Sequence, residues 1–280
     1  NKMGDRRLGR KRLEAVLKNL NATEADSTGS RSGLRGFEMP AWQLQPAKYW
    51  GLFDDFKTVS GVTDLAQDDD FVLTHANSGL VGAIWDVTAG GTSPSVLLDN
   101  AEVGGAVLLA GTADDDIARL FAVNNPMALD AASPRKIWME ARLKLSDVDA
   151  SGFFFGLAGN GTAATVDTTV LASTGGLADG IGWQIHDGTA AVTFASITAV
   201  GDVETVTQSS TSAADATYVI LSVYYDGSSA HFYINGELSH SSALNLPADG
   251  TLICPHIEFI QQTGDSDTLH VDYVNYCMER

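Results

Sequence analysis

The stretch ATYVILSVYYDGSSAHFYINGELSHS, residues 216–241, constrains the fold more than any other part of this chain. Apolar residues at positions 219, 221, 223 and 225 alternate with residues that face the other way, which is the two-residue period of a β-strand. Asp226-Gly227 then begins a short turn. Phe232 and Ile234 alternate on the returning strand, and Asn235-Gly236 makes a second turn. This succession predicts an antiparallel β-meander.

The same kind of pattern continues along most of the chain. From about residue 57, short apolar runs alternate with clusters of Gly, Asp, Asn and Ser, as in a β-sandwich. The runs that predict strands are residues 71–75, 80–87, 95–99, 105–111, 117–123, 136–145, 152–158, 180–187, 191–197, 203–207, 217–226, 230–236, 256–262 and 269–278. No long amphipathic helix separates them, so we expect an all-β protein with two antiparallel sheets rather than a parallel α/β fold.

Three segments resemble one fold family. The Asp-Gly turn followed by FYING, the run WMEARLKL (138–145) and the run LHVDYVNY (269–276) are similar to strands of the concanavalin A-like, or laminin G-like, jelly roll. The last two look like strands of laminarinase-type glycoside hydrolases. The resemblance covers roughly residues 136–280 and implies a two-sheet antiparallel jelly-roll sandwich, and the strand pattern extends this domain over residues 57–280. It leaves function open, because enzymes, lectins and virion proteins share this fold.

The hydrolases of this fold family carry paired acids in an E-x-D-x-x-E strand, where one acid is the nucleophile and the other the proton donor. Glu140, Glu204 and Glu258 have no such partner, and Asp265 and Asp267 lie in a Gly/Ser turn. The six histidines are scattered, without metal-binding or catalytic spacing. We therefore predict a protein that is not an enzyme, with no catalytic residues, no metal site and no cofactor.

Two other kinds of site, a calcium site and a sugar site, have candidate residues in the sequence. The acid runs 68–70 and 114–116 lack calcium-loop spacing, which favours solvated turns over a lectin-like calcium site. A sugar site would use aromatic residues, and the candidates for it are Trp85, Trp183, Tyr224 and Tyr225, although aromatics at strand spacing are usually core. Cys254 and Cys277 lie in strand-like apolar runs, which favours buried free thiols over a disulfide.

The N-terminal segment differs from the rest of the chain in charge. Residues 1–36 contain nine Lys and Arg and four Asp and Glu, a net charge of +5, whereas the remainder has eight and 31, a net charge of −23. Asp5 is a plausible helix N-cap, and a leucine-rich stripe with i, i+3, i+4, i+7 spacing follows it. We predict a basic amphipathic arm and linker over 1–36. Its partner-binding residues are Arg6, Arg7, Arg10, Lys11, Leu13, Val16, Leu17 and Leu20.

An aromatic strip follows the linker. Residues 37–56 contain two prolines and several aromatic residues, which predict an extended segment rather than a long helix. Trp42, Tyr49 and Trp50 form its candidate contact strip. The strip could lie along the body or along a neighbouring chain.

The arm, MGDRRLGRKRLEAVLKNLN, resembles the opening of structural proteins of tailed bacteriophages, especially marine and cyanobacterial phages. With a jelly-roll body, this implies a capsid decoration (cement) protein of the virion, usually a trimer, whose partner is the major capsid protein or another virion protein. The alternative is a carbohydrate-binding module or a tail or fibre component. The acidic body opposes binding to nucleic acid and to anionic membranes. The chain shows neither an apolar signal-peptide region nor a transmembrane segment, so localisation in the virion after synthesis in the host cytoplasm is expected.

Overall fold

The structure is a computed structural model, and it describes residues 49–54, 85–98, 106–122, 127–129, 135–159, 177–185 and 192–279. Within these ranges the regular secondary structure is entirely β, which confirms the predicted fold class. The strands are β1 (Tyr49–Asp54), β2 (Asp86–Gly90), β3 (Ser95–Leu98), β4 (Val107–Gly111), β5 (Ile117–Phe121), β6 (Met127–Ala128), β7 (Ile137–Leu145), β8 (Ser151–Gly159), β9 (Gly180–Ile185), β10 (Thr193–Val200), β11 (Val203–Ser212), β12 (Val219–Tyr225), β13 (Ala230–Ile234), β14 (Glu237–Ser242), β15 (Leu252–Gln261) and β16 (Asp267–Glu279). The described part holds no helix that could span a membrane.

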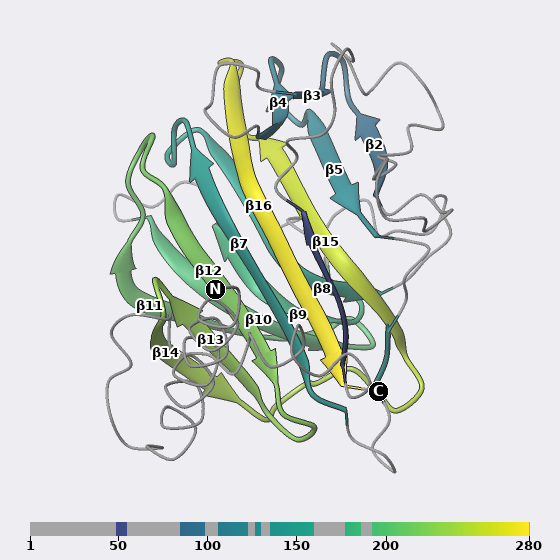
Figure 1. Cartoon of the computed structure of the whole chain (residues 1–280). Helices are drawn as coiled ribbons and strands as arrows, with labels where there is room; N and C mark the ends of the chain where they lie inside the picture. Colours follow the sequence, from purple (N-terminus) through teal and green to yellow (C-terminus); the bar gives the residue numbers. More distant parts are fainter. Residues whose placement is uncertain are drawn as a thin grey trace, which may run out of the picture.

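Two antiparallel sheets pack face to face (Figure 1). Sheet A has the order β14-β13-β12-β7-β16-β4-β3, and β1 adds to it beside β16. Sheet B has the order β11-β10-β9-β8-β15-β5-β2, and β6 pairs with β15. Strands that are neighbours in a sheet are often distant in sequence, as in β7 and β16, so the chain crosses repeatedly between sheets. This is the two-sheet jelly-roll sandwich that the sequence predicted.

The meander predicted from residues 216–241 is present as β12, β13 and β14. Val223 pairs with Phe232 between the first two strands, and both side chains are buried in the core. Gly227 in the first turn has a φ of 103°, and Asn235 and Gly236 in the second have φ values of 51° and 85°. These are left-handed conformations that Gly and Asn adopt at low cost, so the turn chemistry fixes the strand register.

Most of the other predicted strands are also found, with changed ends. Of the run predicted at 80–87, residues 80–84 lie outside the described residues, Trp85 precedes β2, and β2 begins at Asp86. The run at 203–207 extends to Ser212 as β11. The predicted strand at 71–75 and the acid run at 68–70 lie outside the described residues.

The core lies between the sheets and is built by alternation along the strands, which a β-bulge between Val271 and Tyr273 interrupts in β16. In β7, the buried core residues Ile137, Met139, Ala141, Leu143 and Leu145 alternate with residues that face outward. Adjacent strands contribute in the same way, so the outward residues of both sheets form two outer faces. We call them the outer face of sheet A and the outer face of sheet B.

One buried carboxylate ties two turns together at the β2–β5 end of the molecule. Asp116 accepts hydrogen bonds from the backbone N–H groups of Thr92, Ser93, Thr112 and Ala113, at 2.7 to 3.1 Å. Burial raises the pKa of Asp116, but the four backbone donors outweigh it, and the net shift is downward. Donors therefore surround both oxygens, which leaves this carboxylate no lone pairs directed at a calcium ion. Of the predicted solvated run 114–116, Asp114 and Asp115 are exposed, whereas Asp116 is buried.

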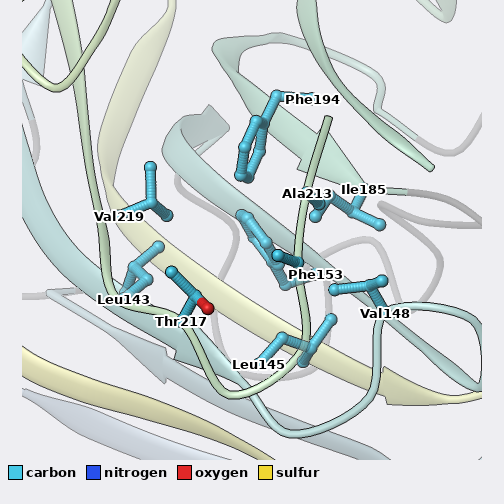
Figure 2. Close-up of a pocket in the computed structure, with 10 residues that line it drawn as sticks. Leu143, Leu145, Val148, Phe153, Ile185, Phe194, Ala213, Thr217 and Val219 are labelled. Atoms are coloured by element: carbon cyan, nitrogen blue, oxygen red, sulfur yellow. The ribbon is translucent and has the colours of Figure 1, made fainter. Parts of the chain in front are cut away.

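At the opposite end, the segment joining β11 to β12 crosses from sheet B to sheet A and covers the core. Its backbone is held by hydrogen bonds from Ala213 N to Val192 O and from Ala216 N to Leu145 O. Beneath it lies a small apolar cavity, lined by side chains that include Leu145, Phe153 and Phe194 (Figure 2). The cavity leaves about 10 Å³ for the centre of a water molecule. It is a packing gap rather than a ligand site, since ligand sites are far larger.

Candidate functional site

The outer face of sheet B does not place paired acids on one strand. Its described carboxylates are Glu258 on β15 and Glu204 on β11, which are separated by β8, β9 and β10. Four strand spacings amount to about 19 Å. The two acids of a glycoside hydrolase lie roughly 5 to 9.5 Å apart. Between Glu258 and Glu204, β9 presents Gly180, Gly182 and Gln184 outward, so these two acids do not have the spacing of a glycoside-hydrolase pair.

Instead, the outer face of sheet B carries a buried ion cluster of Arg119, His256 and Glu258. Arg119 Nε lies 2.6 Å from Glu258 Oε2, and His256 Nε2 lies 3.4 Å from the same oxygen. The relative exposures are 6% for Arg119 and 0% for both partners. Within the described part of the chain, His256 Nδ1 and Glu258 Oε1 are buried without a hydrogen-bond partner.

Aromatic rings pack around this ion cluster. The rings of Phe121 and Phe154 both lie 5.9 Å from the His256 ring, one stacked and one edge-on. Phe154 also lies over Gly182, where a Cβ atom would come within 2.5 Å of its ring. The ion cluster is therefore a packed, dry layer. Its acid is paired with Arg119 and withdrawn from solvent, so the pair links the adjacent strands β5 and β15.

The outer face of sheet A carries an aromatic row at its β7, β12 and β13 strands. The ring centroid of Trp138 lies 6.4 Å from that of Tyr224 and 6.2 Å from that of Tyr233. Tyr224 stacks on His231 at 5.7 Å. Trp138 is buried, whereas Tyr224, Tyr233 and His231 are partly exposed. We call these four side chains the aromatic row.

A chain of polar contacts continues from the aromatic row to the edge of sheet A. His231 Nδ1 lies 2.9 Å from Ser241 Oγ, and His231 Nε2 lies 3.0 Å from Asp226 Oδ2. The other Asp226 oxygen accepts hydrogen bonds from the backbone N–H groups of Ser228 and Ser229. Burial opposes ionisation of Asp226, but these donors and His231 lower its pKa strongly. Asp226 is therefore ionised at neutral pH and fixes the orientation of the His231 ring.

Carboxylates near the middle of the outer face of sheet A are also held by partners. Glu140 accepts hydrogen bonds from Ser222 Oγ at 3.1 Å and from Tyr273 OH at 2.8 Å. Asp272 lies 2.6 Å from Arg142 Nη1. Each of these two acids therefore has a hydrogen-bond or ion-pair partner within the body.

The sequence-predicted site residues fall into three groups. Of the sugar candidates, Trp85 and Trp183 are completely buried in the core and Tyr225 is 7% exposed, so these three cannot contact a sugar. Trp183 and Tyr225 sit at inward positions of their strands, and Trp85 directly precedes β2. Tyr224 alone faces outward. Asp265 is exposed and Asp267 is buried against Ser146 and Gln261, so they form no acid pair.

The arm and the strip are described only in part. The arm residues Arg6, Arg7, Arg10, Lys11, Leu13, Val16, Leu17 and Leu20, and Trp42 of the strip, lie outside the described residues. Tyr49 and Trp50 lie in β1, where their backbones pair with Glu279 and Met278 of β16. Cys254 and Cys277 are buried free thiols, as predicted, and burial raises the pKa of each to about 12.

The sequence reasoning missed the contacts of His231. His231 follows Asp226 by five residues across a tight turn, and Ser241 is its register partner on β14. A hairpin register written out from the two turns would have placed these side chains on one face. The ion cluster was harder to find, because Arg119 and Glu258 are 139 residues apart.

Comparison with known proteins gives the fold and little more. No family model and no curated protein matches the chain. Among solved structures, the chain is similar to a GH16 protein of the mixed-linkage glucan locus of Bacteroides ovatus, with 12% identity, a TM-score of 0.51, and coverage of 80% of this chain and 99% of that one. It is also similar to a protein of unknown function from Shewanella oneidensis MR-1, with 12% identity, a TM-score of 0.50, and coverage of 87% and 95%.

Peanut lectin is a third similar structure, with 10% identity, a TM-score of 0.47, and coverage of 82% and 97%. At such identities the likeness concerns the fold alone. The chain therefore shares the two-sheet antiparallel jelly-roll fold of the GH16 protein.

Proposed function

We propose that this chain is a non-enzymatic structural protein of a virion, a capsid decoration protein that docks through its N-terminal arm. One observation carries the first half of the proposal. The central carboxylates of both outer faces are engaged by partners within the body, as Glu258 is by Arg119 and Glu140 is by Ser222 and Tyr273. A body whose central carboxylates have such partners functions by binding other molecules at its surface rather than by catalysis.

The arm supports the second half. Its net charge of +5 stands against −23 for the remainder, so a partner with an acidic surface attracts the arm and repels the body. Arg6, Arg7, Arg10 and Lys11 would provide this attraction, and the stripe of Leu13, Val16, Leu17 and Leu20 would fill a groove on the partner. The partner would be the major capsid protein or another virion protein. Binding to DNA would not require the leucine stripe.

The test is quantitative co-sedimentation of the full chain with purified capsid shells. We expect stoichiometric binding that is lost when Arg6, Arg7, Arg10 and Lys11 are replaced by Glu. A matched control replaces Arg135 and Lys136 of the body with Glu and should bind like the wild type. Absence of the protein from purified virus particles, or equal binding of both variants, would contradict the docking role.

A second candidate function is carbohydrate binding, and the aromatic row favours it. Sugars stack on partly exposed aromatic rings and take hydrogen bonds from nearby polar groups, and Tyr224, Tyr233, His231 and Ser241 offer both. A glycan array probed with the full chain tests this. Binding that is lost in Tyr224→Ala but kept in the arm variant would favour a lectin-like module over a decoration protein.

A further inference from the structure

The two sheets end together on one side of the molecule, at β11 and β14. These strands are the terminal strands of sheet B and sheet A and contact each other (Figure 1). Thr198 Oγ1 donates to Leu244 O at 2.7 Å, and Asn245 Nδ2 donates to Thr205 Oγ1 at 2.8 Å. The two terminal strands and the segment through Asn245 therefore form one surface, which we call the open edge.

Exposed aliphatic side chains concentrate at this open edge. Within the described residues, five large hydrophobic side chains are exposed. Val203 and Val206 lie on β11, Leu238 lies on β14, and Leu244 follows β14; their exposed fractions are 57%, 46%, 56% and 66%. The fifth, Leu252, lies at the start of β15 in the middle of sheet B. Such clustering marks an interaction surface, whereas single exposed aliphatic residues do not.

The strands of the open edge carry few of the features that keep sheet edges apart. Such features include Lys, Pro, inward charges, β-bulges and a very short strand. β11 has ten residues and contains neither Lys nor Pro, but its pairing with β10 is irregular between Gln208 and Ser212. The edge strands on the other side, β2 and β3, have only five and four residues. The regular part of β11, residues 203–208, exposes backbone N–H and C=O groups that can pair with another strand.

Charge indicates which partner fits. The chain carries a net charge of −18, so two copies repel each other over most of their surface. Residues 205–214 and 238–248 contain no Asp, Glu, Lys or Arg. Apart from Glu204 on β11 and Glu237 on β14, the open edge is therefore uncharged, so a second acidic copy can approach it more closely than the rest of the surface.

We infer that the open edge is the surface on which a second copy of this chain docks, with β11 pairing antiparallel to β11 of that copy about a twofold axis. Twofold contacts are self-complementary, which suits one strip facing itself. A strand of ten residues is about 33 Å long, and a sandwich roughly 20 Å thick then offers on the order of 600 Å² per copy. That approaches the roughly 800 Å² per partner of a stable interface. The inference is independent of the docking role proposed above.

The mass of the full chain in solution tests this inference, measured by light scattering over about 1 to 100 µM, the range of such interfaces. We expect a dimer whose dissociation constant rises about tenfold or more in Val206→Lys and in Leu244→Lys, because each buries an unpaired charge. Leu252→Lys is the matched control and should leave the dimer intact. A monomer throughout, a trimer as the phage resemblance implies, or equal weakening by Leu252→Lys would each overturn the inference.

Cross-linking decides the matter if a lysine variant fails to fold. Val206→Cys and Gln208→Cys place thiols on the outer face of β11, and a short bis-maleimide should join two copies through at least one of them. Cys254 and Cys277 are buried and their pKa values are raised to about 12, so they do not react with the maleimide. Leu252→Cys should give no linked dimer. Failure of both β11 variants to cross-link would overturn the pairing.

Discussion

Two arginine–carboxylate pairs lie on opposite outer faces of the sandwich and differ in one respect. Arg119–Glu258 on sheet B and Arg142–Asp272 on sheet A both have an N–O distance of 2.6 Å. The side chains of the first pair are 7% and 0% exposed, whereas those of the second are 38% and 25% exposed. Equal contact distances therefore conceal different energetic roles, because water screens the second pair and not the first.

The difference indicates where function can lie. Charges that are buried and paired, as on sheet B, serve the stability of the fold. Removing either one would leave the other charge buried without its partner and without solvent. Arg142 and Asp272 on sheet A stay in contact with water and can exchange partners at little cost, whereas Glu140 on the same face is buried. The outer face of sheet A and the open edge are thus the surfaces available for binding.

The largest expected effect comes from breaking the buried pair. Glu258→Ala leaves Arg119 buried without its partner, which should lower the free energy of unfolding by about 3–5 kcal/mol. Urea unfolding followed by tryptophan fluorescence measures it. Replacing both residues together, with Arg119→Met and Glu258→Leu, should recover most of the loss. A loss below about 1 kcal/mol in Glu258→Ala would show that the pair is not dry.

Asp116 provides an intermediate case, a buried carboxylate held by backbone donors rather than by arginine. Asp116→Ala should cost about 2–3 kcal/mol, because four N–H groups lose their acceptor and water replaces it only in part. Since the folded-state pKa lies below the unfolded value, this stabilisation is present at neutral pH and is lost as the pH falls through the folded-state pKa. The difference in stability between wild type and Asp116→Ala should therefore shrink in acid. A pH-independent difference would contradict ionisation of Asp116.

The exposed pair should contribute little. A double-mutant cycle with Arg142→Ala and Asp272→Ala should give a coupling of about 0.2–1 kcal/mol. Arg142→Ala alone should cost more than Asp272→Ala, because the guanidinium also lies 3.9 Å from the centre of the Tyr218 ring. Equal single costs would indicate that the ring contact is not stabilising. A coupling above 2 kcal/mol would remove the contrast between the two faces.

The smallest expected effect is that of salt, which should weaken the ion pair on sheet A and leave the pair on sheet B nearly unchanged. Raising the ionic strength to about 1 M shortens the screening length to about 3 Å. The Arg142–Asp272 coupling should then fall towards zero, whereas the cost of Glu258→Ala should hardly change. The same unfolding measurements in low and high salt provide both numbers. Parallel loss of both effects would mean that solvent reaches both pairs.

Sequence reasoning found the fold because the strand signals are local. Alternation in 219–225 and the turn residues at 226–227 and 235–236 set the meander, and the sandwich follows from repetition of such runs. It could not assign faces to isolated aromatic residues. Trp85 and Trp183 are core and Tyr224 is outward, and only the register with neighbouring strands decides between these positions.

The charged contacts were beyond local patterns for a related reason. Arg119 meets Glu258 through the pairing of β5 with β15, which are far apart in the chain. Asp116 stands in a run of three aspartates that reads as a solvated turn, and its burial depends on the β2–β3 turn folding against it. Long-range pairing, rather than residue type, determines which acids are buried.

The position of β1 has a mechanical consequence. Its six residues pair antiparallel with the last part of β16, from Tyr49 opposite Glu279 to Asp54 opposite Val274. Tension on the chain ahead of Tyr49 therefore reaches the sandwich first at this ladder. β16 passes the load to β7 and β4, the other two strands that it pairs with in sheet A.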